Sequence, residues 1–114
     1  MKLSEVKNIL SAEVLTGEEF LDKEVYSACG CDLMSDVLAF VKDRALLLTG
    51  LMNTQVIRTA EMMNIETVIF VRGKKPSEEI VGMAKMKDIV VMTTEYPLYI
   101  AGGKLYEAGL GNNR

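Results

Sequence analysis

The chain has 114 residues, of which 49% are hydrophobic and 25% are charged, and its formal net charge is −3. These values suit one globular domain spanning residues 1–114 and exclude disordered and fibrous proteins. The acidic balance disfavours nucleic acid as a partner, and the absence of a signal-peptide core or a membrane-length apolar run predicts a cytoplasmic protein without membrane contact.

The first third of the chain predicts two helices and two strands. Apolar residues at helical spacing indicate a helix over residues 3–10, for which Ser4 is the expected cap. Alternating polar and apolar residues indicate strands at 12–16 and 23–29. Asp32 is expected to cap a second helix, which buries Leu33, Val37, Leu38 and Val41.

The central stretch, residues 45–73, predicts a strand, a helix and a second strand. Its apolar runs at 45–48 and 67–71 do not alternate with polar residues. Strands of this kind are covered on both faces, as in parallel sheets. Between the runs, apolar residues recur at helical spacing, at Val56, Ile57, Ala60 and Met63.

The last third predicts two further helices around a strand at 89–93. Pro76 is expected in the first turn of the first helix, with Glu78 and Glu79 at its positive end. The final helix should be capped by Thr93 or Thr94, contain Pro97 in its first turn and end near Gly109.

Two adjacent glycines, Gly102 and Gly103, interrupt this final helix. Each costs a helix about 1 kcal/mol relative to alanine, so the pair predicts either close packing of another backbone or a break in the helix. Residues 111–114 are expected to fray.

Strands alternate with helices, which predicts a three-layer α/β/α sandwich with a mainly parallel sheet. In such folds ligands bind beyond the carboxyl ends of the strands. Helix starts at these ends can hold an anion, here beside the cationic side chains of Arg72, Lys74 and Lys75, so a small anionic ligand is a candidate. The alternative is that glycines there only turn the chain. The candidate ligand-binding residues are Thr49, Gly50, Asn53, Arg72, Gly73, Lys74 and Thr94.

Cys29 and Cys31 form a second candidate, because two protomers facing each other would offer four thiolates to a metal. One protomer has no histidine and too few cysteines for a closed zinc site, so we favour two small thiols that are part of the fold. We therefore predict no metal and no cofactor. The methionines have two interpretations, core filling and a contact surface, for Met52, Met62, Met83 and Met86.

Catalytic motifs are absent from the sequence, which lacks histidine, a P-loop and a nucleophile elbow. We therefore predict that the protein is not an enzyme. An enzymatic alternative would need a carboxylate base of raised pKa, for which the candidates are Asp32, Asp36 and Glu95.

Thr49-Gly50 followed by a polar step and a helix, together with residues 68–97 (VIFVRGKKPSEEIVGMAKMKDIVVMTTEYP), resembles the DRTGG domain. Residues 32–38 (DLMSDVL) and 103–109 (GKLYEAG) are similar to short stand-alone members from anaerobic bacteria. The resemblance spans about residues 3–110. Val71-Arg72-Gly73 stands where the family pattern has Thr-Gly-Gly.

This resemblance implies a fold similar to the amino-terminal domain of HPr kinase/phosphorylase, without the P-loop kinase domain. The capped helix ends and the lack of a catalytic motif lead to the hypothesis of a non-catalytic regulatory domain that self-associates and senses a small anionic metabolite or nucleotide. The resemblance further implies a homodimeric regulatory or assembly module that mediates contacts between subunits or with a partner. The alternative that it implies is an accessory protein docking on a redox complex of iron hydrogenase or ferredoxin type, without a small ligand.

Overall fold

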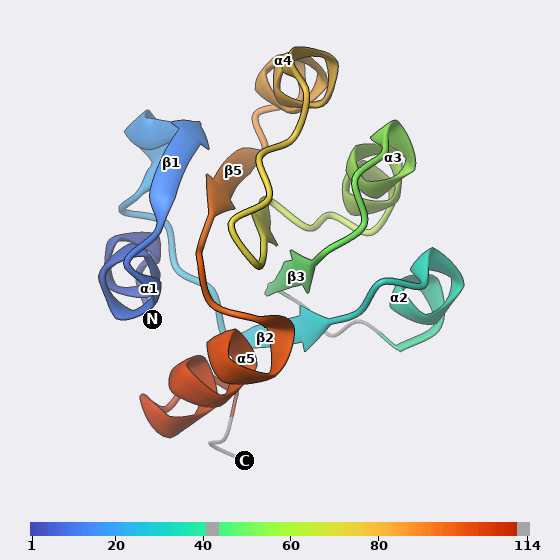
Figure 1. Cartoon of the computed structure of the whole chain (residues 1–114). Coiled ribbons are helices and arrows are strands. Elements are labelled where there is room, and N and C mark those ends of the chain that lie inside the picture. Colours follow the sequence, from blue (N-terminus) through green and yellow to red (C-terminus); the bar gives the residue numbers. More distant parts are fainter. Residues whose placement is uncertain (41–43, 112–114) are drawn as a thin grey trace.

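A sheet of five strands in the order β1-β5-β4-β3-β2 forms the middle layer of the computed structural model, which describes residues 1–40 and 44–111 (Figure 1). Strands β2 to β5 pair in parallel, and β1 pairs with β5 in the antiparallel direction. The strands are β1 Glu13–Thr16, β2 Ser27–Gly30, β3 Ala45–Thr49, β4 Thr67–Phe70 and β5 Val90–Thr93.

Helices cover both faces of this sheet (Figure 1). One face carries α1 (Leu3–Leu10) and α5 (Leu98–Glu107), and the other carries α2 (Met34–Phe40), α3 (Thr54–Met62) and α4 (Glu78–Met86). A short 3-10 turn, η1, spans Glu18–Phe20. The predicted three-layer sandwich with a mainly parallel sheet is confirmed. None of the helices in the described residues is long and apolar enough to cross a lipid bilayer.

Two hydrophobic cores lie between the sheet and its helices. In β3, Leu46 and Leu48 belong to the core under α1 and α5, whereas Leu47 belongs to the core under α2, α3 and α4. All residues of β3, β4 and β5 are buried, which is why these strands lack alternation in the sequence.

Several predicted helix starts are wrong by a few residues. The N-cap of α1 is Lys2 rather than Ser4, because the helix already begins at Leu3, which is buried. Pro76 precedes α4 instead of entering its first turn, and Ser77 caps that helix by accepting a hydrogen bond from the Ile80 N–H at 3.3 Å. Glu78 and Glu79 do lie in the first turn, as expected.

The start of α5 also differs from the prediction. Pro97 is its N-cap, not Thr93 or Thr94. The Thr94 hydroxyl is buried and donates instead to the Leu10 carbonyl at 2.7 Å, which ties α1 to the end of β5. The helix ends at Glu107, two residues before the expected Gly109.

The segment around α2 shows the largest departure. Strand β2 begins at Ser27 rather than at residue 23, and Asp32 does not cap α2, because its carboxylate bonds to the end of β3. The helix begins at Met34, so Met34 and Val37 are buried while Leu33 and Leu38 are 59% and 44% exposed. Val41 lies outside the described residues.

Neither prediction for the glycine pair in α5 holds. The helix continues through both residues without a break. A Cβ atom placed on Gly102 would lie 4.0 Å from a methyl group of Leu48, and one placed on Gly103 would have no neighbour within 4 Å among the described residues. No backbone packs closely here; the glycines instead line a groove.

Candidate functional site

The carboxyl ends of three parallel strands lie side by side. Thr49 pairs in register with Phe70, and Phe70 pairs with Thr93. The turns that follow are tied together, because the Arg72 N–H donates to the Tyr96 carbonyl at 2.9 Å and the Gly73 N–H donates to the Thr94 carbonyl at 2.8 Å. We call the surface formed by residues 49–50, 72–74 and 95 the strand-end rim.

Gly50 is the centre of this rim. Its N–H donates to Asp32 Oδ1 at 2.7 Å, and the neighbouring Thr49 hydroxyl donates to the same oxygen at 3.0 Å. On the other side of the residue, Lys74 Nζ donates to the Gly50 carbonyl at 3.0 Å. The Lys74 backbone is fixed in turn, because its carbonyl accepts from the Thr93 hydroxyl at 2.6 Å. Gly50 is therefore contacted by one carboxylate and one ammonium group.

The guanidinium of Arg72 lies above the same residue. A Cβ atom placed on Gly50 would lie 3.5 Å from Arg72 Nη2 and 3.6 Å from Asp32 Oδ2. Arg72 is exposed. Within the described residues, neither Arg72 nor Lys74 forms an ion pair within 4.0 Å. Two cationic groups therefore converge on Gly50 without a directly paired carboxylate.

Gly73 and Glu95 close the other end of the rim. Gly73 has a φ of +67°, and a Cβ atom there would lie 2.8 Å from Glu95 Oε1. The backbone conformation therefore favours glycine, and the flexible Glu95 side chain would have to move to admit a larger residue. The carboxylate of Glu95 brings negative charge to this end, so the positive part of the rim is confined to the neighbourhood of Gly50.

Two of the sequence-based candidates are engaged elsewhere. Asn53 caps α3 by accepting from the Gln55 N–H at 3.0 Å, and the Thr94 hydroxyl bonds to Leu10 as described above. Lys75, also expected near an anion, pairs with Glu13 at 3.4 Å. The structure thus brings Thr49, Gly50, Arg72, Gly73 and Lys74 together.

Asp32 is the rim residue whose role the sequence prediction missed. The signal was present, because Asp32 follows β2, and β2 is the parallel neighbour of β3, where Gly30 pairs with Leu48. The residue two positions beyond a strand end can reach the end of the adjacent strand. The sequence pattern instead favours Asp32 as a helix cap.

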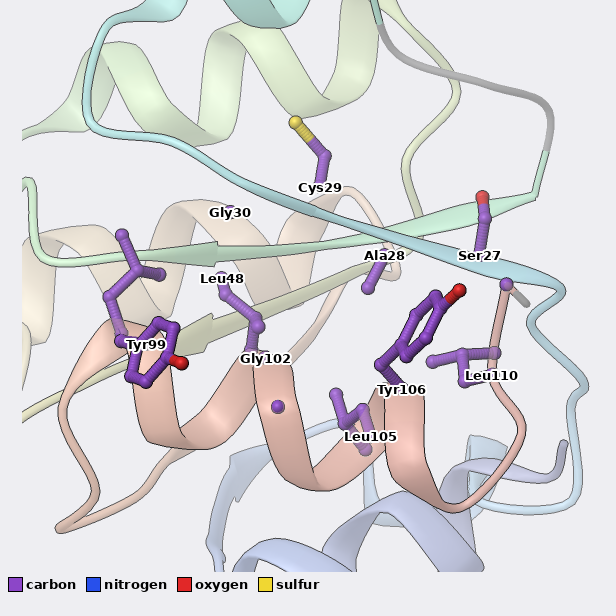
Figure 2. A pocket seen from close by; sticks show the side chains of 13 residues that line it. Ser27, Ala28, Cys29, Gly30, Leu48, Tyr99, Gly102, Leu105, Tyr106 and Leu110 are labelled. Carbon is purple, nitrogen blue, oxygen red and sulfur yellow. The ribbon is translucent and has the colours of Figure 1, made fainter.

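A groove of about 860 Å³ lies between α5 and the edge strand β2 (Figure 2). Tyr99 and Tyr106 project from α5 on either side of Gly102. Strand β2, on the opposite side of the groove, contributes small residues, which leaves space between the strand and the helix. Cys29 points away from α5, toward the other face of the sheet (Figure 2). The lining is largely apolar and includes Ala28, Gly30, Leu48, Leu98, Gly103, Leu105 and Leu110.

The two thiols are half-buried beside β2. Burial raises the pKa of Cys29, and the neighbouring Cys31 and Asp36 raise it further. Cys31 Sγ donates to the Leu33 carbonyl at 3.2 Å and accepts from the Leu33 N–H at 3.3 Å. Within residues 1–40 and 44–111, no group of three or more histidine, cysteine, aspartate or glutamate side chains is placed to hold a metal ion.

The chain matches the model of a known protein family and is similar in fold to a solved regulatory structure. The DRTGG domain model matches residues 5–105. The fold is similar to the crystal structure of the CBS and DRTGG domains of the regulatory region of Clostridium perfringens pyrophosphatase, complexed with the activator diadenosine tetraphosphate, with a TM-score of 0.74 and 21% sequence identity. The match covers 97% of this chain but 48% of that one, about half its length. A sequence search of curated proteins finds no match.

Proposed function

Because the chain belongs to the DRTGG domain family, we propose that it is a non-catalytic cytoplasmic regulatory module that binds a small anionic metabolite or nucleotide at the strand-end rim and self-associates along β2. The family membership confirms the resemblance noted in the sequence. The similar fold in a regulatory region that is complexed with a nucleotide activator supports a regulatory role.

The convergence of Arg72 and Lys74 on Gly50 is the observation that carries the ligand proposal. Arg72 Nη2 and Lys74 Nζ approach one short backbone segment from the turn after β4, and neither has an ion-pair partner among the described side chains. Hydrogen bonds from charged donors to a carboxylate or phosphate are about twice as strong as neutral ones, and the planar guanidinium suits both groups.

A thermal-shift screen with adenine nucleotides, sugar phosphates and acetyl phosphate tests this proposal. A ligand at about a hundredfold excess over its Kd stabilises the folded state by about 2.7 kcal/mol, which raises the Tm by several degrees. We expect Arg72→Gln to lose most of this rise. Lys75→Gln is the matched control, because it removes the same charge from a residue paired with Glu13 outside the rim.

Two outcomes contradict the ligand proposal. One is the absence of stabilisation by any compound at millimolar concentration. The other is an equal loss of stabilisation in Arg72→Gln and Lys75→Gln, since that would show a dependence on net charge and not on the rim.

Strand β2 supports the proposal of self-association. It lies at one edge of the sheet, with β3 as its strand partner. An edge strand exposes unpaired backbone groups to which another chain can add. The flanking helices α2 and α5 expose the large apolar side chains Leu38, Tyr99, Ile100 and Tyr106, and Leu33, directly before α2, is exposed as well. A symmetric pair would bring this edge against its own copy.

An alternative function follows from a different surface. Met62 on α3 and Met86 on α4 are 70% and 88% exposed, and these two helices are in contact. Methionine is frequent on adaptable binding surfaces. This favours an accessory protein that docks on a redox complex of iron hydrogenase or ferredoxin type through α3 and α4. That alternative predicts a chain that is monomeric until its partner is present, which the mass in solution distinguishes from self-association.

A further inference from the structure

Asp32 already accepts hydrogen bonds from the polar groups at the carboxyl end of β3. One of its carboxylate oxygens accepts from the Gly50 N–H at 2.7 Å and from the Thr49 hydroxyl at 3.0 Å. Arg72 Nη2 lies 3.5 Å from the position that a Cβ atom on Gly50 would take, and Asp32 Oδ2 lies 3.6 Å from it. A backbone N–H and a hydroxyl, with a guanidinium nearby that has no ion-pair partner among the described residues, are the groups that would bind the anionic end of a ligand. The side chain of Asp32 thus stands where such a group would bind.

We propose that the Gly50 N–H, the Thr49 hydroxyl and Arg72 form an oxyanion subsite, which Asp32 occupies in the free protein and from which a carboxylate or phosphate of the ligand displaces it. This inference rests on the proposed ligand function of the rim. It adds the position of the anionic group and names the residue that competes for it.

Displacement of Asp32 is compatible with its surroundings. Asp32 is exposed, so its carboxylate gains hydration from water when it leaves. The Cys31 N–H donates to the Leu48 carbonyl at 3.0 Å, which anchors the residue before it, and α2 begins at Met34. Leu33 is held by Cys31 Sγ and by the first turn of α2, so the part free to move is the side chain of Asp32.

Ligand and Asp32 exclude each other for two reasons. Both need the same hydrogen from Gly50, and two negative charges a few ångströms apart repel each other. The free protein therefore binds an anion more weakly than the vacant subsite would. Its apparent Kd is the Kd of the vacant subsite divided by the fraction of time that the subsite is vacant.

The same competition connects the rim to the edge of the sheet. Leu33, which follows Asp32, is part of the apolar surface around β2 proposed for self-association. Release of Asp32 removes the two hydrogen bonds that tie the residue before Leu33 to the end of β3. A ligand would thus alter the border of the dimer surface while the backbone of Leu33 stays in place.

A titration with inorganic phosphate at constant ionic strength, followed by the Gly50 amide resonance in 15N-labelled protein, tests the inference. If Asp32 occupies the subsite nine-tenths of the time, its removal in Asp32→Ala should lower the apparent Kd for phosphate about tenfold. Asp32→Asn removes the charge but keeps an acceptor oxygen, so a smaller decrease is expected. Asp36→Ala is the matched control, since Asp36 is an exposed carboxylate in the first turn of α2.

The direction of the effect separates this inference from other roles of Asp32. Folded Asp32→Ala and Asp32→Asn proteins that bind phosphate as weakly as the wild type, or more weakly, would overturn it. So would an equal gain from Asp36→Ala. In each case, an Arg72-dependent thermal shift would leave the proposed ligand function intact. If phosphate moves the Gly50 amide in none of the proteins and no compound raises the Tm, both proposals fail.

Discussion

Arg72 has a φ of +60°, a backbone conformation that residues other than glycine rarely adopt. The family pattern Thr-Gly-Gly places a glycine at this position, where the conformation has no steric cost. Ser11, Arg44, Asn64 and Asp88 share the same conformation, so it does not by itself indicate a site. Arg72 differs because it follows a central strand and its guanidinium lies above Gly50. The strained backbone of Arg72, together with the position of its guanidinium beside Gly50, supports the proposed role of Arg72 in binding an anion.

Cys29 provides a pH-dependent prediction at the scale of one residue. Its pKa is raised in the folded state, first by burial and then by Cys31 and Asp36. The neutral thiol is therefore favoured by folding, and its contribution to stability is present below the ordinary thiol pKa and lost as the pH rises through the raised pKa.

We expect iodoacetamide to modify Cys29 with a pH midpoint that is higher in the folded protein than in urea. The measurement uses Cys31→Ser, which leaves one thiol and retains burial, the largest cause of the shift. Reaction is through the thiolate, so the rate reports its fraction. Equal midpoints in folded and unfolded protein would contradict the assigned environment.

At the scale of elements, α5 is less stable than a helix of the same length without internal glycines would be. Gly102 and Gly103 lie inside the helix, and the structure shows no packing that requires a hydrogen at either position. Their absence of side chains opens the groove opposite Ala28 and Gly30. The helix therefore carries a conformational cost that the fold itself does not need.

Gly103→Ala should raise the free energy of unfolding by about 1 kcal/mol, measured by urea denaturation. Gly17→Ala is the control with the opposite sign, because Gly17 has a φ of +88° and a Cβ atom there would lie 2.9 Å from Val90 Cα. That change should lower the stability by more than about 1 kcal/mol. A destabilised Gly103→Ala protein would show that α5 packs more closely at this point than described.

At the scale of the whole molecule, the two edges of the sheet lead to different assemblies. The edge at β2 is flanked by α5 and α2, whereas α4 contacts β1 and β5 at the other edge. We expect the wild-type protein to sediment with the mass of two chains. Leu38→Glu and Tyr99→Glu should each reduce this to one chain, because they place a charge in the proposed interface.

Met86→Glu is the control for these two variants, since it adds the same charge to a side chain on α4 that is 88% exposed. Dissociation by Met86→Glu and not by the other two would move the interface to α4. A wild-type protein that sediments as one chain at all concentrations would contradict self-association and favour docking through α3 and α4.

The sequence was most informative where periodicity is determined by burial. Burial determines the apolar runs of β3, β4 and β5 and the apolar stripe of α3. The central strand-helix-strand unit and the three layers could therefore be predicted. The ends of these strands could be predicted from where the apolar runs stop, and this placed Thr49, Gly50 and Arg72 at one rim. Side-chain partners did not follow, because Asp32 and Thr94 bond to elements distant in sequence rather than to the helices they precede.

The pairing of β1 with β5 has a consequence for synthesis on the ribosome. Residues 13–16 have their sheet partner at residues 91–93, and α1 packs against α5. The apolar face of α1, with Leu3, Val6 and Leu10, therefore stays uncovered until most of the chain has been translated. Strands β3, β4 and β5 pair with one another and can assemble earlier. Helix α1 is thus among the last elements of this domain to be packed, and during that interval its apolar face is open to chaperones.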